Sequence, residues 1–244
     1  MKLTKSILMC ILLGVTTPWT QKALGQKFND AIKRSKEGAE LISNLAKLPD
    51  KGIPKELITR AEAIGVFPCK KTDLLIESAV ICPGVISRYI TDGWSLPAYY
   101  RFGAGGLGRP DPVVRDATVV ILLFMDKESV DWLSKGFSLS KDCIAVAGPL
   151  DRMSEDERVN VAKAHLIGYV YKKNVLLGRT LELTSFGQGM AVGSDRNINE
   201  NLYGLKAWEI LAGKSIPTSK TIPAEIPAFQ QALKEHYGKR ALSP

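Results

Sequence analysis

Histidine is scarce in this chain, and the sequence offers little from which to build a hydrolytic site. Only two of the 244 residues are histidines, His165 and His236. A serine or cysteine nucleophile would have to recruit one of them, and the sequence has no Gly-x-Ser-x-Gly elbow. His165 begins an apolar strand-like run and His236 lies in a helical one, so we interpret both as structural or surface residues. We predict that the protein is not an enzyme.

Cysteine is also too sparse to hold a metal or a full set of disulfides. Beyond the N-terminal region the chain has Cys69, Cys82 and Cys143, an odd number with no metal-ligand spacing. We interpret Cys143 as a buried thiol, and a bridge between Cys69 and Cys82 stays open. Acidic residues between 151 and 157 match no calcium loop and are interpreted as a solvated polar loop. We expect no metal and no cofactor.

Long hydrophobic runs are missing as well. Lys2 and Lys5 precede a nine-residue apolar run from Ile7 to Val15, about half of the roughly 20 residues that cross a bilayer. A charged start, a short apolar run and a polar stretch ending at Gly25 are typical of a secretory signal peptide. We predict cleavage after Gly25 and a secreted or periplasmic protein. The alternative is a short membrane anchor.

A glycine cluster at residues 103–108 matches the spacing of a dinucleotide fingerprint, and Asp126 follows where a ribose-binding acid would lie. The fold that uses this fingerprint needs a helix directly after the glycines, and Pro110 and Pro112 stand there instead. We therefore interpret the glycines as tight turns or bulges. Nucleic acid is not expected either, because no basic stretch is interleaved with stacking aromatic residues.

The positive charge that the chain does carry is concentrated at its ends. The formal net charge of +8 falls to +5 without Lys2, Lys5 and Lys22 of the signal segment. Residues 26–60 contribute +3 and residues 234–244 contribute +2, which leaves the middle neutral. This asymmetry favours attraction to an anionic surface such as a membrane, an acidic protein or a polyanion.

The first segment after the predicted cleavage site reads as an amphipathic helix, Gln26 to Leu48, with apolar residues at helical spacing and lysines on the other side. Two interpretations stay open. The helix packs its apolar side on its own domain, as most amphipathic helices do. Alternatively it lies on a membrane, with Phe28 and Ile32 dipping into the interface and its lysines at anionic headgroups.

The remaining pattern predicts an α+β fold with a mostly antiparallel, curled or barrel-like sheet flanked by N- and C-terminal helices. Asp126 is expected to cap a helix over 127–135 that stops at Gly136. Pro83-Gly84 is expected to separate two strands, and Asp195-Arg196-Asn197 to mark a loop. The expected strands are 74–82, 85–90, 98–102, 117–125, 143–147, 165–171 and 175–184. Further helices are expected at 53–61, 205–212 and 224–237.

Several short motifs between Ile53 and Lys214 together resemble the SYLF domain family of lipid-binding proteins. The motif residues, which we expect to be structural, are Trp94, Ser95, Pro97, Gly103, Gly105, Gly106, Gly148, Pro149, Tyr203 and Gly204. Together with the patterns at the two ends, the resemblance predicts three parts: a signal peptide at 1–25, a SYLF-like lipid-binding domain at 26–216, and a C-terminal linker and helix at 217–244.

The same resemblance implies a function. Eukaryotic members bind phosphoinositide membranes, some bind actin, and bacteria contain exported, stand-alone versions. Lipid contacts in the family are attributed to a basic, amphipathic N-terminal region. Here that region supplies the expected lipid-binding residues Lys27, Phe28, Ile32, Lys33, Arg34, Lys36 and Lys47. We expect peripheral attachment to an anionic phospholipid or phosphoinositide surface. The alternative is a protein-interaction or envelope scaffold module that binds a protein partner through the neutral β-rich middle.

Overall fold

The computed structural model describes residues 18–47, 53–69, 79–105, 118–138, 154–172, 175–177 and 190–238. The helices are α1 (Pro18–Ala46), α2 (Lys55–Arg60), α4 (Lys127–Lys135), α5 (Glu155–Lys163), α7 (Arg196–Tyr203), α8 (Ala207–Leu211) and α9 (Ala228–Tyr237). The strands are β1 (Ala63–Pro68), β2 (Ala79–Ile90), β3 (Gly93–Trp94), β4 (Ala98–Gly105), β5 (Val119–Phe124), β6 (Phe137–Ser138), β7 (Leu166–Lys172), β8 (Val175–Leu177) and β9 (Met190–Ser194).

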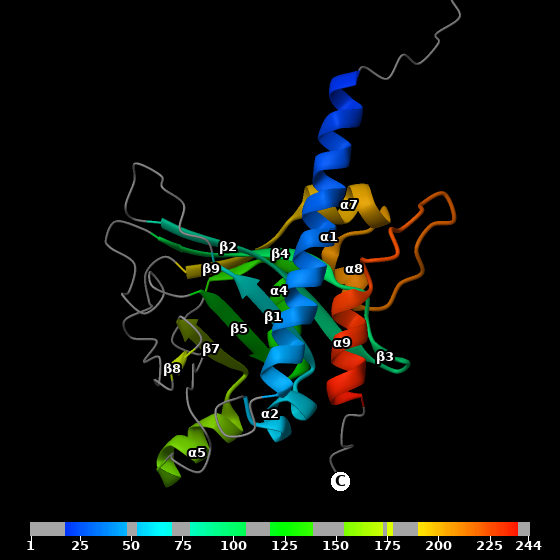
Figure 1. Ribbon diagram of the computed structural model, residues 1–244. Coiled ribbons are helices and arrows are strands. Elements are labelled where there is room, and N and C mark those ends of the chain that lie inside the picture. The colour runs from blue at the N-terminus through cyan, green and yellow to red at the C-terminus, as the bar shows by residue number, and fades with distance from the viewer. Residues whose placement is uncertain are drawn as a thin grey trace, which may run out of the picture.

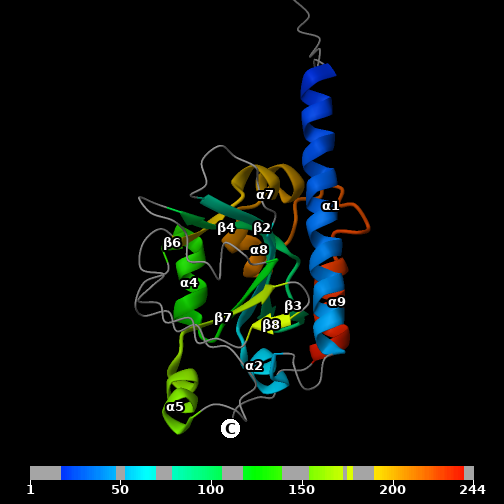
Figure 2. The same ribbon diagram turned by 60° about the vertical axis from the view of Figure 1, so that its left-hand side comes forward.

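All described strands belong to one antiparallel sheet in the order β6-β9-β4-β2-β1-β5-β7-β8, with β3 paired to β2 (Figure 1). Turning the molecule shows α4 on one side of the sheet and α1 with α9 on the other (Figure 2). The predicted α+β class, with a curled antiparallel sheet flanked by terminal helices, is confirmed.

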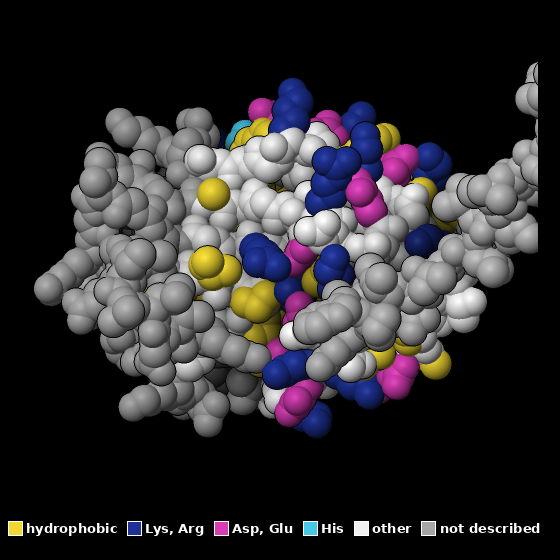
Figure 3. All heavy atoms as spheres, turned by 90° about the horizontal axis from the view of Figure 1, so that it is seen from above, with side chains coloured by type: hydrophobic (Ala, Val, Ile, Leu, Met, Phe, Trp, Pro, Cys, Tyr) yellow, Lys and Arg dark blue, Asp and Glu magenta, His cyan; other side chains and the backbone are white. Residues whose placement is uncertain are grey.

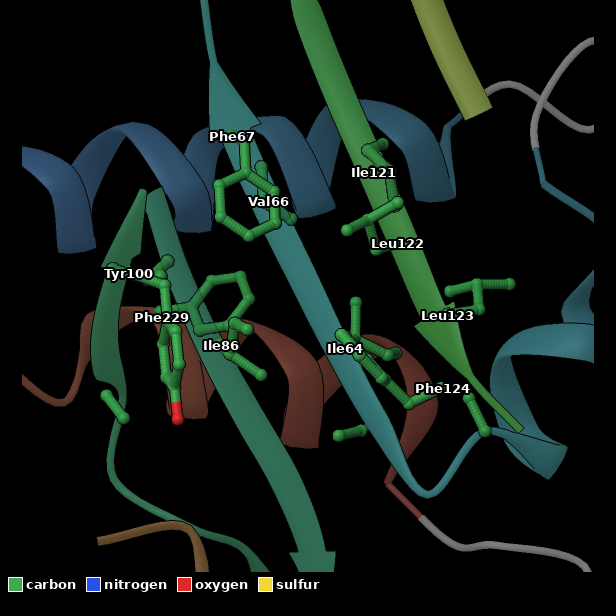
Figure 4. Close-up of a cluster of buried hydrophobic side chains, with 14 of the residues drawn as sticks. Ile64, Val66, Phe67, Ile86, Tyr100, Ile121, Leu122, Leu123, Phe124 and Phe229 are labelled. Carbon is green, nitrogen blue, oxygen red and sulfur yellow. The ribbon is translucent and has the colours of Figure 1, made fainter. Parts of the chain in front are cut away.

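The centre of the sheet is apolar on both faces. β5 reads Val-Val-Ile-Leu-Leu-Phe and every residue in it is buried. Alternation along a strand points Val66 and Ile121 to one face, and Phe67 and Leu122 to the other (Figure 4). A strand without polar positions forms only where both faces are covered. Helices are therefore required on each side.

Helices α1 and α9 cover the face that carries Val66. Gly38 of α1 lies so close to its neighbours that an added Cβ would meet Phe229 Cδ2 of α9 and Val85 Cγ2 of β2, each at 2.9 Å. Phe229 and Leu233 of α9 are fully buried. The predicted C-terminal helix thus contributes to the core, although it begins at Ala228 and not at residue 224.

The prediction of two strands separated by Pro83-Gly84 is wrong, because β2 runs without interruption from Ala79 to Ile90. The β1–β2 register ends at Val66 and Val85, so Pro83 pairs only across to Arg101 of β4. Proline is tolerated in such an edge-like setting. At Gly84 a Cβ would lie 2.3 Å from the Val66 carbonyl oxygen, so the close approach of β1 requires glycine there.

Other boundaries also differ from the sequence-based expectation. Residues 196 and 197, expected in a loop, begin α7, which buries Ile198, Asn199, Leu202 and Tyr203. Residues 155–157, expected in a polar loop, begin α5. β9 was not anticipated. Residues 74–78, 143–147 and 178–184 of the expected strands lie outside the described residues.

Several local predictions are confirmed. Asp126 caps α4 by accepting a hydrogen bond from the Ser129 amide at 2.8 Å, and α4 ends at Gly136 with φ of 70°. The bridge that the sequence left open is present: Cys69 and Cys82 form a disulfide across the end of the β1–β2 pair, with their Cα atoms 4.3 Å apart. Cys143 lies outside the described residues.

The close approach at Gly84 gives a stability test. We expect Gly84→Ala to lower the free energy of unfolding by about 3 kcal/mol, since the new methyl group meets backbone that cannot move aside without breaking the β1–β2 ladder. Gly103→Ala is the matched control, because a Cβ at this position of β4 meets nothing within 4 Å. Urea unfolding of both variants measures the difference. Equal destabilisation would contradict the packing described here.

Candidate functional site

Helix α1 is fixed to the sheet by a buried polar cluster, which we call the docking cluster: Arg34, Ser35, Tyr99, Asp195 and Asn199. Arg34 Nη1 donates to Asp195 Oδ2 at 3.2 Å, and its other terminal nitrogen pairs with Asp30. The side chains of Arg34 and Asp195 are 5% and 7% exposed. A buried charge is stable only when paired and hydrogen-bonded, so this pair fixes the rotation of α1 about its axis.

The other members join α1 to β4 and α7. The hydroxyl groups of Ser35 and Tyr99 are 2.8 Å apart. Burial raises the pKa of Tyr99 to about 12, the largest of several influences, so its hydroxyl stays neutral. Asn199 donates to the Tyr99 carbonyl and accepts from the Tyr99 amide, both at 2.9 Å. The cluster therefore satisfies backbone groups as well as side chains.

Some of the described motif residues lie next to this cluster. The Tyr203 hydroxyl donates to the Pro97 carbonyl at 2.8 Å, and its ring stacks on Tyr99 with centroids 6.3 Å apart. Gly204 ends α7. Trp94 and Ser95 are buried. Gly103 and Gly105 lie in β4, whereas Gly106, Gly148 and Pro149 fall outside the described residues.

The residues expected to contact lipid divide into three groups. Lys33 and Lys36 are 56% and 58% exposed, and Lys47 is also exposed. Lys27, Phe28 and Ile32 are partly exposed, and the two apolar residues pack against the core. The prediction that Arg34 contacts lipid is wrong, because Arg34 is buried in the docking cluster and is not available to a surface ligand. The sequence could not reveal this, because the partner Asp195 is 161 positions away.

The exposed lysines share one side of α1. At about 100° per residue, Lys33 and Lys36 point away from the buried residues Ala31, Gly38 and Ile42, and the exposed Lys47 follows the last residue of the helix. The first of the two interpretations of this helix is thereby confirmed, because its apolar side packs on its own domain. α1 also continues upward beyond the sheet, and Gly25 there has nothing within 4 Å of an added Cβ (Figures 1 and 2).

Basic and acidic side chains are interspersed in this region. Figure 3 shows lysine and arginine side chains mixed with aspartate and glutamate side chains over the face seen from above. Two of the α1 lysines have acidic neighbours, Lys33 with Glu37 at 3.9 Å and Lys36 with Glu225 at 3.7 Å. Such exposed pairs contribute little to stability and leave the lysines free to exchange partners.

A second cluster joins Asp126, His165 and Trp132 beside α4. His165 Nδ1 bonds Asp126 Oδ2, and the His165 ring lies 5.9 Å from that of Trp132. Desolvation raises the pKa of Asp126, but hydrogen bonds from Ser129 and His165 outweigh it, and the net pKa is lowered. Asp126 is thus a helix cap and not a ribose-binding acid. Ser129 hydrogen-bonds to Asp126 and is buried, so the cluster lacks an accessible nucleophile there.

The parts of the chain that the structure describes contain no group of three or more His, Cys, Asp or Glu residues able to hold a metal ion. Within those same parts, no helix combines the length and the apolar character that crossing a membrane requires.

Comparison with protein families identifies the domain. Residues 115–236, half of the chain, match the family model Ysc84, described as a Las17-binding protein actin regulator. The chain belongs to the Ysc84 (SYLF) family. The resemblance drawn from its motifs is confirmed, and the matched range includes Asp195 and Asn199 of the docking cluster and all of α9 but its last residue.

Curated relatives of this Ysc84 domain are SH3 domain-containing YSC84-like protein 1 from several vertebrates. The protein from Xenopus laevis is 25% identical over 171 residues, which cover 68% of this chain and 49% of the relative. The human protein is 24% identical over 187 residues, covering 75% of this chain and 52% of the relative. The chain therefore spans about half the length of the curated relatives it matches.

The docking cluster makes a testable prediction about Arg34. We expect Arg34→Met to lower the free energy of unfolding by about 3 kcal/mol, because Asp195 stays buried while losing one of its two cationic partners. Lys33→Met, one residue away on the exposed side, should change it by less than about 0.5 kcal/mol. Chemical denaturation of both variants decides the point. A similar cost for the two would show that Arg34 is not a buried anchor.

Proposed function

We propose that this Ysc84-family protein is an exported, non-enzymatic lipid-binding module that attaches peripherally to anionic membranes through the exposed side of α1. One observation carries the proposal. Lys33 and Lys36 lie on the exposed side of α1 together with the acid Glu40, and Lys47 follows the last residue of the helix about 20 Å along from Lys33, while the apolar side of that helix is buried in the domain. We call the three lysines the lysine face.

The chemistry of this attachment is electrostatic. A lysine close to an anionic membrane contributes about 1 kcal/mol, and the effect falls off within a Debye length. Phosphate oxygens would replace Glu37 and Glu225 as partners of Lys33 and Lys36. Phe28 and Ile32 already pack against the core, so insertion of apolar side chains adds little in this arrangement. The proposed contact is a salt-sensitive surface contact.

Two further features support export. The charged and apolar pattern of residues 1–25 is typical of a signal peptide. The Cys69–Cys82 disulfide is a bond that persists in oxidising compartments. Cleavage after Gly25 would remove residues 18–25 of α1, and the first buried residue after Gly25 is Ala31.

Export predicts the mass of the mature protein. Protein recovered from the medium or the periplasm should begin at Gln26, and its mass should fall by the two hydrogens of one disulfide compared with the reduced form. Intact mass spectrometry before and after reduction measures both. An uncleaved chain with free Cys69 and Cys82 thiols would contradict export.

The membrane proposal predicts binding to anionic vesicles only. Lys33→Glu, Lys36→Glu and Lys47→Glu together should weaken binding to phosphatidylglycerol-containing vesicles by about a hundredfold or more, because three favourable contributions become unfavourable. Co-sedimentation measures the affinity, and added salt should weaken it.

The control carries the same change in charge on other helices: Lys127→Glu, Lys135→Glu and Lys163→Glu, all exposed residues of α4 and α5. It should bind nearly as the unaltered protein does. Equal binding to neutral phosphatidylcholine vesicles, or equal loss in both triple variants, would overturn the proposal.

A second candidate function is protein binding. It is favoured by the family description, which names a Las17-binding actin regulator. It would use the neutral sheet surface, where Gly103 and Gly193 leave open space and Ile81 is 41% exposed. A protein partner captured equally by the unaltered chain and by the lysine-face variant would favour this function over lipid binding.

A further inference from the structure

The structure places a histidine of α9 within the lysine side of α1. Lys36, Glu40 and Ser43 are related as i, i+4 and i+7, which puts them in one row along α1, and Lys47 follows the last residue of the helix. His236 reaches this row from α9, with Nε2 3.2 Å from the Ser43 hydroxyl. The order after Lys36 is therefore Glu40, then His236 beside Ser43, then Lys47, with about 10 Å between the Lys36 and Ser43 positions.

The surroundings of His236 accommodate both of its protonation states. The Ser43 hydroxyl can donate to a neutral imidazole nitrogen or accept from a protonated one, so the contact survives protonation. His236 is partly exposed and lies in the last turn of α9, where the helix dipole favours positive charge. Burial raises the pKa of the neighbouring Tyr237 to about 12, so this residue stays neutral.

The charged residues on α9 and on the elements packed against it carry both signs. From Lys36 toward the His236 end they are Lys36, Glu37 and Glu40 of α1, Lys47 directly after it, Lys55, Glu56 and Arg60 of α2, Arg88 of β2, and Lys234 and Glu235 of α9. Within the described part of the chain none of them is ion-paired with His236, and Lys36 pairs instead with Glu225 just before α9. A proton on His236 thus adds a charge to the row and is not cancelled by a carboxylate bonded to it.

We infer that His236 belongs to the surface that contacts anionic phospholipid, and that its protonation strengthens attachment below neutral pH. The inference rests on the proposed function. Histidine is the side chain whose charge ordinarily changes between pH 5 and 8, and this chain has only two. The other, His165, is bonded to Asp126 beside α4 and not to the α1–α9 pair. A proton on His236 adds one positive charge beside Lys36, Glu40 and Lys47.

The test measures vesicle affinity at pH 5.5 and pH 7.5, using phosphatidylcholine vesicles with and without phosphatidylglycerol. The unaltered protein should bind the anionic vesicles about fivefold more tightly at pH 5.5, the effect of one added charge near an anionic surface. His236→Gln should bind equally at both pH values. His236→Lys should bind at pH 7.5 as tightly as the unaltered protein does at pH 5.5, and without pH dependence.

His165→Gln is the matched control and should keep the fivefold pH dependence. The inference is overturned if His236→Gln retains the dependence, if His165→Gln abolishes it, or if the unaltered protein binds anionic vesicles equally at both pH values. That last result would leave lipid binding itself intact. Absence of binding to anionic vesicles at either pH would instead overturn the proposed function, and the role of His236 with it.

Discussion

The requirement to cover both faces of an entirely apolar strand pair organises this protein. β1 and β5 have no polar side on which to meet water, so helices must lie over each face. On one face this role falls to α1 and α9, whose contact through Gly38 and Phe229 leaves no room for a side chain between them. The apolar side of α1 is thereby committed to the domain. Only the opposite side, with its lysines, is left for a ligand.

The docking cluster determines which side that is. Arg34 and Asp195 are stable in the core only as an ion pair. A rotation of α1 would separate them and leave a buried charge without its partner, so the pair fixes the orientation of the helix. The Ser35 and Tyr99 hydroxyl groups, 2.8 Å apart, lie one residue further along the same side. Lys33 and Lys36, on either side of this pair of residues in sequence, are consequently held outward. A buried ion pair here defines the orientation of an exposed surface.

Much of the fold could be predicted from the sequence because its signals are local. The Asp126 cap and the Gly136 stop of α4 depend on neighbouring residues, and the motif between Trp94 and Gly204 was sufficient to recognise the family. Predictions failed where distant residues decide. Pro83 and Gly84 read as a break, yet the surrounding ladder carries β2 through them. Arg34 reads as one more cation of a basic helix, and only the fold brings Asp195 to it. The proximity of His236 to Ser43, 193 positions apart, is likewise a product of tertiary packing.

The disulfide between Cys69 and Cys82 has a practical consequence for handling the protein. It closes a ring that includes the basic pair Lys70-Lys71, a sequence that trypsin recognises. A single cut inside the ring leaves the two pieces covalently joined, so a nicked molecule migrates as an intact chain on a denaturing gel without reductant. Only a reducing gel separates the fragments. Preparations judged homogeneous under oxidising conditions therefore need this second check before their binding is measured.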